Sequence, residues 1–371
     1  MPQRSRPPFR ADHVGSLLRP RSVRAARAAH SAGRMTGAEL RRVEDAAIRD
    51  LVRMQLDSGL GAVTDGEIRR RSWHMDFLYQ LGGVERDDTK VAVQFHGERG
   101  DIPFAAEGLR ITGRIALRHT IFGEDFAYLK SVANGAVAKL TLPSPSMIHR
   151  RGGRIFAGSP YRDVDELFAD VAQAYADEIE RLGGLGLTYL QLDDTTFATL
   201  CDPEQRAGMT KAGADGERVH LKYIALVNAA IRNRPAGMAV CTHSCRGNFR
   251  SAWIASGGYD FIAEALFNTL EVDGFFLEYD DDRSGGFAPL RFLPKGKVAV
   301  LGLVTTKRGA LESKDALKRR IDQAAKYVPL EQLCLSPQCG FASTEEGNDL
   351  TDAEQAAKLR LVVETAREVW G

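Results

Sequence analysis

The sequence predicts an α/β fold, a (β/α)8 TIM barrel with an antiparallel insertion after its second strand. Eight short apolar segments, each typical of a buried strand, alternate with amphipathic segments of helical period. No GxGxxG sequence follows the first of these strands, which argues against an open dinucleotide-binding sheet. A chain of 371 residues is long enough for one barrel with insertions, and we expect residues 1–371 to form a single domain.

The predicted strands are short apolar runs, most of them followed by a polar or Gly/Pro loop. Continuous apolar runs of this kind are typical of parallel strands that are buried on both faces. They cover residues 11–18, 61–67, 137–145, 187–194, 238–245, 273–280, 297–306 and 331–340.

The predicted helices have an amphipathic period, and three of them begin at a residue that can cap a helix. Thr36 is followed three residues later by Glu39, the pattern of a capping box, while Ser313 and Thr351 are also suitable N-caps. The helices are expected over residues 36–59, 163–184, 216–233, 313–328 and 351–370.

Residues 82–134 are too many for a single crossover between parallel strands. They contain stretches in which polar and apolar residues alternate, at 91–95 and 108–117, so we interpret the segment as an antiparallel insertion that caps the barrel mouth. Its basic side chains either contact an anionic substrate or form a solvated face. They are His96, Arg99, Arg110, Arg114, Arg118 and His119.

The composition excludes several classes of partner. With 50 basic and 49 acidic residues the net charge is +1, which favours neither nucleic acid nor an anionic membrane as the main partner. The N-terminal stretch MPQRSRPPFR lacks the apolar core of a secretory signal, and no apolar run approaches the length of a spanning helix. Five cysteines are an odd and low number, so we expect reduced thiols in a cytoplasmic protein.

Metal-binding residue types occur where the predicted strands end. His243 and Cys245 end the fifth strand, Glu278 lies near the end of the sixth, and Cys339 ends the eighth. In a parallel barrel the chemistry is at these carboxyl ends. Thiolates with an imidazole and one carboxylate select zinc over magnesium or calcium, so we predict a Zn²⁺ site. Glu278 supplies the hardest donor of the four.

Other residues of the same types compete with this assignment. Glu264 also follows the His-x-Cys pair, but it falls in a helix-like segment, and we prefer Glu278. Cys201, Cys241 and Cys334 have no partner at a strand end, and we expect them to be core thiols.

Several segments of the chain together resemble the C-terminal catalytic barrel of cobalamin-independent methionine synthase, in its shorter single-barrel form. The resemblance covers roughly residues 11–370. It is carried by HVGSLLRP (13–20), VTDGEIRR (63–70), LQLDD (190–194), HSC (243–245), FFLEYD (275–280) and SPQCG (336–340).

The resemblance implies roles for individual residues. His243, Cys245, Glu278 and Cys339 become zinc ligands, and Ser16, Glu67 and Asp193 become the groups that hold the amino-acid part of a thiol such as homocysteine. Glu278 and Asp193 are then also candidate catalytic groups.

The sequence departs from the family in the region that would contact the methyl donor. After the seventh strand the family has a histidine that acts as an acid, whereas this chain has Thr305, Thr306 and Lys307. Lys307 is therefore a further candidate catalytic group. The family tryptophan after the third strand is also not evident, and His149 near that place either binds substrate or is polar packing.

Three functions agree with these residues. The first is a zinc-dependent thiol methyltransferase that uses a folate or corrinoid donor. The second is a zinc-dependent thiol alkyltransferase acting on an epoxide or another small electrophile, as in epoxyalkane–coenzyme M transferases. The third is a barrel with a structural zinc only, which the wide sequence separation of the ligands disfavours. The oligomeric state stays open.

Overall fold

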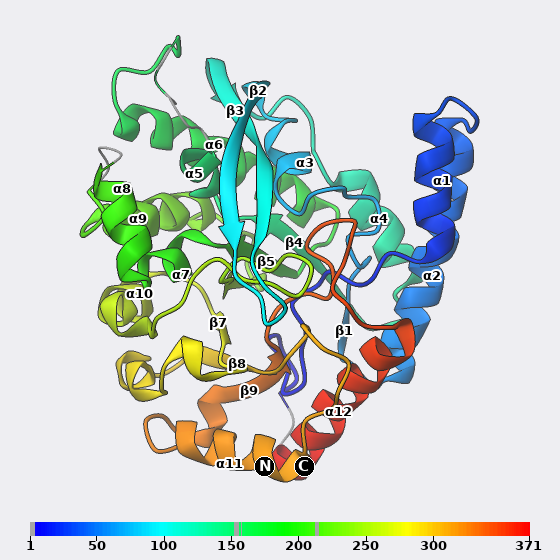
Figure 1. The fold of residues 1–371 in the computed structure, drawn as a ribbon, viewed down its shortest axis with the longest axis vertical. Helices are drawn as coiled ribbons and strands as arrows, with labels where there is room; N and C mark the ends of the chain where they lie inside the picture. Colours follow the sequence, from blue (N-terminus) through cyan, green and yellow to red (C-terminus); the bar gives the residue numbers. More distant parts are fainter. Residues whose placement is uncertain (1–3, 152–155, 157, 212–214) are drawn as a thin grey trace.

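The computed structural model describes residues 4–151, 156, 158–211 and 215–371, so the first three residues of the N-terminal stretch lie outside it. Its centre is a parallel sheet surrounded by helices, a TIM-barrel-like α/β fold (Figure 1). In the described residues the sheet has seven strands, and every neighbouring pair is parallel. In spatial order they are β1 (Ala62–Val63), β4 (Val137–Pro143), β5 (Tyr189–Asp194), β6 (Ala239–Ser244), β7 (Gly274–Glu278), β8 (Val298–Val304) and β9 (Leu333–Pro337).

The predicted first strand, residues 11–18, is not a regular strand, so the prediction of eight strands is not confirmed. The segment makes one parallel bridge, Ala11 to Leu335 of β9, and further along the Leu17 N–H donates to Gly66 O at 3.0 Å. It therefore lies between β9 and β1, where an eighth strand would be.

Side chains take the hydrogen bonds that a ladder would need in this segment. Lys139 Nζ donates to His13 O (2.5 Å), and Gln191 Nε2 donates to Val14 O (2.6 Å). The Thr64 hydroxyl donates to Gly15 O at 2.6 Å. With these three carbonyls occupied by side chains, residues 13–15 do not pair with a neighbouring strand, whereas the backbone at Arg10 and Asp12 still pairs with Leu335 of β9.

The helices confirm the sequence prediction closely because their caps form as expected. Thr36 and Thr351 each form a complete capping box, with Glu39 and Glu354, and Ser313 accepts the Ala316 N–H. The five predicted helices correspond to α2 (Gly37–Asp57), α6 (Val164–Gly184), α9 (Val219–Ile231), α11 (Lys314–Ala324) and α12 (Asp352–Trp370). Further helices are α1 (Arg21–Ser31), α3 (Met75–Leu78), α4 (Gly123–Val132), α5 (Met147–Arg151), α7 (Thr196–Leu200), α8 (Pro203–Lys211) and α10 (Ala263–Thr269). No helix in the described ranges is long and apolar enough to cross a membrane.

The predicted insertion is an antiparallel hairpin of two long strands, β2 (Gly82–Phe95) and β3 (Ile102–Ala116). It follows β1 in the chain, as predicted, but the antiparallel part ends at Ala116, and α4 within the predicted range packs against β4 as a helix of the barrel. At its far end the hairpin pairs with the loop after β6, through a bridge between His96 and Trp253. Figure 1 shows the hairpin projecting across the molecule as a separate pair of arrows.

The side chains inside the sheet form a small buried cluster that includes two cysteines. Cys241 and Cys334 pack there with Tyr189 and Phe276, as expected for core thiols, and Cys201 is buried in the larger cluster between sheet and helices. Beside them is an ion pair with fully buried side chains, Lys139 Nζ to Asp12 Oδ1 at 3.2 Å. The Tyr189 hydroxyl donates to the other Asp12 oxygen at 2.8 Å.

Replacing Lys139 by Met should destabilise the protein by about 3–5 kcal/mol, because Asp12 would remain as a buried charge without its cation. Chemical denaturation followed by circular dichroism measures the loss. The double variant Asp12→Asn/Lys139→Met should lose less than Lys139→Met alone, and Lys318→Met, which breaks a half-exposed pair with Glu368, should change stability by about 0–1 kcal/mol. Equal losses for Lys139→Met and Lys318→Met would contradict the expected effect.

Candidate active site

Four potential metal ligands meet at the carboxyl end of the sheet. His243 lies in β6, Cys245 follows that strand directly, Glu278 is the last residue of β7, and Cys339 lies two residues after β9. One ligand atom from each is within 4.8 Å of the others, and all four residues are buried. The two sulfur atoms are 3.6 Å apart. The residues predicted from the strand ends thus come together in space.

Backbone contacts hold two of these ligands in place. The Cys245 N–H donates to Asp194 O at 2.7 Å, which continues the pairing of β5 with β6. The chain then turns at Gly247, whose φ of 84° suits glycine, and the Gly247 N–H points to Cys245 Sγ at 3.4 Å. The Arg246 N–H donates to Glu278 Oε1 at 3.0 Å.

The loop after β9 approaches the N-terminal segment closely, and this contact places Cys339. A side chain at Gly340 would collide with Ser16, because a Cβ there would lie 1.9 Å from Ser16 Oγ. The Phe341 N–H donates to Ser16 O at 2.9 Å. Glycine at position 340 therefore allows Cys339 and Ser16 to approach the same space.

The electrostatics of the four-residue cluster fit a bound soft cation. Hydrogen bonding to the neighbouring Cys339 thiol, together with burial, holds the pKa of the Cys245 thiol well above its usual range. Both ring nitrogens of His243 are buried and have no hydrogen-bond partner among the described residues. Unpartnered buried nitrogens and two adjacent thiols are costly alone, and a divalent cation would pair with all of them.

A cavity of about 20 Å³ adjoins the cluster and is lined by three of the predicted substrate-binding residues. Ser16, Glu67 and Asp193 face the same space as three of the four potential ligands. The lining consists of Val14, Ser16, Glu67, Trp73, Asp193, His243, Cys245, Cys339, Gly340 and Ser343.

Glu67 is held in this cavity by a tight turn. Its φ is 57°, uncommon for a residue other than glycine, and its N–H donates to Asp65 Oδ1 at 2.9 Å. Oε1 accepts the Thr141 hydroxyl at 2.8 Å, whereas Oε2 is buried without a partner in the described part of the chain. Burial raises the pKa of Glu67, and the nearby Arg70 opposes the rise.

Asp193 is the second carboxyl group of the cavity. It ends the pairing of β4 with β5 and sits opposite His243 in the register of β5 with β6. Gln191 Nε2 donates to its Oδ1 at 2.7 Å. Burial raises the pKa of Asp193 to about 7, and the negative charge of Glu67 adds to this rise. Two carboxyl groups in one buried cavity form a receptor for a cation such as an ammonium group.

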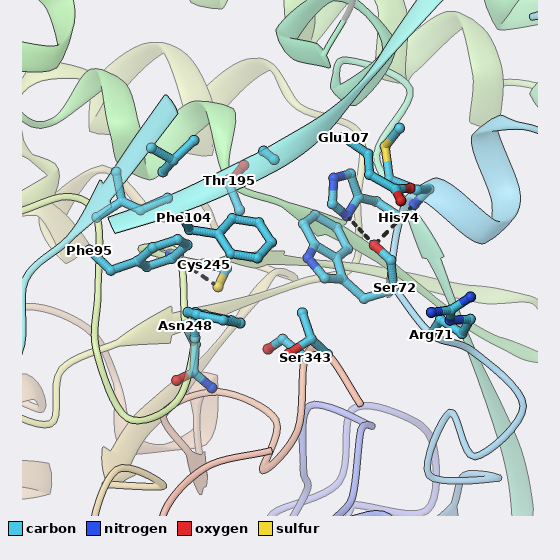
Figure 2. Close-up of a pocket in the computed structure, with 18 of the residues that line it drawn as sticks. Arg71, Ser72, His74, Phe95, Phe104, Glu107, Thr195, Cys245, Asn248 and Ser343 are labelled. Atoms are coloured by element: carbon cyan, nitrogen blue, oxygen red, sulfur yellow. Dashed lines mark hydrogen bonds between the residues drawn. The ribbon is translucent and has the colours of Figure 1, made fainter. Parts of the chain in front are cut away.

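A larger cavity of about 320 Å³ opens on the other side of Cys245. It shares Trp73, Cys245 and Ser343 with the small cavity, so the cysteine sulfur lies at the boundary between the two. Figure 2 shows Phe95 and Phe104 beside Cys245, with Ser72 and His74 further along the cavity.

Aromatic contacts connect the hairpin to this larger cavity. The rings of Phe95 and Phe104 pack on Phe249, with centroid distances of 5.0 and 4.7 Å. Phe249 belongs to the loop that follows Cys245. The hairpin therefore forms one wall of the larger cavity, next to the potential ligand. Two of the predicted basic residues of the hairpin pair with carboxylates away from this cavity: Arg110 pairs with Glu85, and Arg114 pairs with Glu166 and Asp170. Arg86 of β2, in contrast, lines the cavity.

Two predicted site residues lie apart from both cavities. His149, in α5, accepts or donates a hydrogen bond at 2.8 Å with the Tyr223 hydroxyl and packs edge-on against Phe168. Lys307 Nζ is 3.0 Å from Asp280 Oδ2 and borders neither cavity. Glu264, the competitor of Glu278, is exposed on α10, outside the cluster.

Sequence reasoning missed three residues near the cluster. Trp73 and Ser343 line both cavities, and Arg283 lies 3.5 Å from Glu278 Oε2. Trp73 lies a few residues after Asp65-Gly66-Glu67, at the end of the second predicted strand, and this position could have indicated a residue of the site. Arg283 follows three consecutive aspartates, a composition more typical of a solvated loop.

Comparison with known proteins identifies the family of the chain. Residues 9–368 match the family model of the cobalamin-independent synthase catalytic domain. The chain is 47% identical over 370 residues to the uncharacterized protein YxjG of Bacillus subtilis (strain 168), covering 99% of this chain and 96% of that protein. It is 24% identical over 339 residues to the methionine synthase of Saccharolobus solfataricus, covering 88% and 86%.

A solved structure has the same fold over nearly the whole chain. The protein from Listeria monocytogenes described as a proposed vitamin-B12-independent methionine synthase superposes with a TM-score of 0.79 at 39% identity, covering 99% of this chain and 100% of that one. The resemblance noted in the sequence is thus confirmed over nearly its whole length. The protein belongs to the cobalamin-independent synthase catalytic-domain family, and it is an enzyme of the methyltransferase class.

Proposed function

We propose that the protein is a zinc-dependent thiol methyltransferase that transfers a methyl group to homocysteine or a closely similar thiol. The observation that carries this proposal is the convergence of His243, Cys245, Glu278 and Cys339 at the edge of a cavity lined by two buried carboxyl groups. This donor set suits Zn²⁺, and these four residues would hold it. When bound, zinc would lower the pKa of a substrate thiol and so maintain a thiolate nucleophile at neutral pH.

The small cavity, which has room for about one water-sized group, receives the ammonium group of the thiol in this proposal. The unpartnered Glu67 Oε2 and the Asp193 carboxyl group accept hydrogen bonds from the substrate ammonium. Ser16 offers its hydroxyl at the same place. An ammonium between two carboxylates fixes the position of the sulfur relative to the cysteines, which a thiol without an amino group would not achieve.

The larger cavity binds the methyl donor. Its shared boundary with the thiol cavity at Cys245 supports a direct displacement, with sulfur and methyl group approaching from opposite sides. About 320 Å³ is at the lower end of the range for small-molecule sites. We assign the hairpin, through Phe95 and Phe104, the role of covering the barrel mouth and excluding water from this cavity.

A panel of donors tests the function. Zinc-loaded protein is incubated with homocysteine and, separately, methyltetrahydrofolate, methylcobalamin or an epoxide, and the product is identified by mass. We expect a mass increase of one methyl group with a methyl donor. A hydroxyalkyl product with the epoxide alone would replace this proposal by the thiol alkyltransferase, and the absence of any product together with a thiol-insensitive zinc would indicate a structural metal.

A further inference from the structure

Glu278 differs from the other three potential ligands because both of its oxygens already contact positive or donating groups of the protein. Oε1 accepts the Arg246 N–H at 3.0 Å, and Oε2 lies 3.5 Å from Arg283 Nη2. The side chain of Glu278 is 1% exposed and that of Arg283 is 8% exposed, so this contact is largely shielded from solvent.

Arg283 is itself held by ion pairs with two neighbouring aspartates. Its Nη2 lies 2.9 Å from Asp280 Oδ1, and its Nη1 lies 2.8 Å from Asp281 Oδ2. Lys307 Nζ lies 3.0 Å from the other Asp280 oxygen. The Arg283 guanidinium also stacks on the Trp253 ring, 4.8 Å from its centroid, so its position is determined by packing as well as by charge.

We propose that Arg283 is a positioning residue that retains the Glu278 carboxylate and thereby makes it the exchangeable member of the four-residue cluster. With zinc and a substrate thiol bound, the thiolate would take the place of Glu278, its proton would pass to the solvent, and Arg283 would hold the released carboxylate. The inference rests on the proposed function. It also gives Lys307 a role: Lys307 and Arg283 both pair with Asp280, so Lys307 weakens the hold of Asp280 on Arg283 and leaves the arginine available to Glu278.

Glu278 is exchangeable because a bound cation and Arg283 compete for its carboxylate. The side chains Cys245 and Cys339 have no arginine or lysine in ion-pairing contact among the described residues, whereas Glu278 has Arg283. A carboxylate released from the cluster into a buried space without a cation would pay the full desolvation cost. Arg283 removes this cost, because a charge-assisted hydrogen bond to a buried carboxylate compensates for lost hydration.

The main test replaces Arg283 by Met, which keeps the length and removes the charge. In zinc-loaded protein we expect homocysteine affinity, measured by calorimetry, to fall by about tenfold, while zinc affinity in a chelator competition stays equal or rises. Arg283→Lys should recover part of the homocysteine affinity. Arg291→Met is the matched control, because Arg291 is an exposed arginine that also stacks on an aromatic ring, and it should behave like the unmodified protein.

A second variant, with the opposite expected change in zinc affinity, tests the inference if Arg283→Met does not fold. Asp280→Asn removes the carboxylate that competes for Arg283, so Glu278 should be retained more strongly by the arginine and zinc affinity should fall. Zinc-edge absorption of the unmodified protein should also show one oxygen neighbour replaced by sulfur when homocysteine is added.

The outcomes separate this inference from the proposed function. If the unmodified protein binds neither zinc nor homocysteine, the proposed function fails. If it binds both, but Arg283→Met or Asp280→Asn leaves both affinities unchanged, only the role of Arg283 is overturned.

Discussion

Replacing Cys339 by Ser should abolish stoichiometric zinc binding and, with it, methyl transfer. Cys339 and Cys245 supply the two sulfur donors, 3.6 Å apart, and a hydroxyl is a poor substitute for a thiolate toward zinc. Loss of a hydrogen-bonding partner of a ligand already costs roughly 10–100-fold in metal affinity, and loss of a ligand should cost more. Elemental analysis after dialysis against a chelator measures the zinc content, and product mass measures activity.

The matched control for this prediction is Cys241→Ala. Cys241 lies in the same strand as His243, two residues earlier, but packs inside the sheet with Cys334 and Phe276. This variant should keep its zinc, although it loses some stability from the smaller side chain. Cys245→Ser should behave like Cys339→Ser. Full zinc retention in both serine variants would show that the assignment of the cluster is wrong.

Replacing Glu67 by Gln should weaken homocysteine binding by about 2 kcal/mol or more, roughly 30-fold, because a buried charge partner of the ammonium is lost. Gln keeps the shape and the contact with Thr141, so the fold should remain intact. Calorimetry on zinc-loaded protein measures the affinity, and the kinetic effect should appear mainly in KM for the thiol.

The control for Glu67→Gln is a ligand rather than a second variant. A thiol that has the carbon skeleton and carboxylate of homocysteine but lacks the amino group should bind the unmodified protein and Glu67→Gln with similar affinity. The difference between the two ligands isolates the ammonium contact. Equal losses for both thiols would mean that Glu67 supports the cavity and does not contact the amino group.

Much of the fold and of the four-residue cluster follows from local signals. The helices that begin after Thr36, Ser313 and Thr351 were predictable because their capping residues act within one turn. His243 and Glu278 were predictable because strand ends in a parallel sheet converge on one edge, whatever the intervening chain does.

The sequence by itself therefore determined the alternation of strands and helices and the residue types at the strand ends. Only the tertiary structure decided contacts between groups far apart in the chain. Lys139, Gln191 and Thr64 take the carbonyls of residues 13–15, so no regular first strand forms. Tyr223 and Asp280 bind His149 and Lys307, which keeps both from the cavities. A side chain's partner depends on which elements pack beside it, and that is a property of the folded chain.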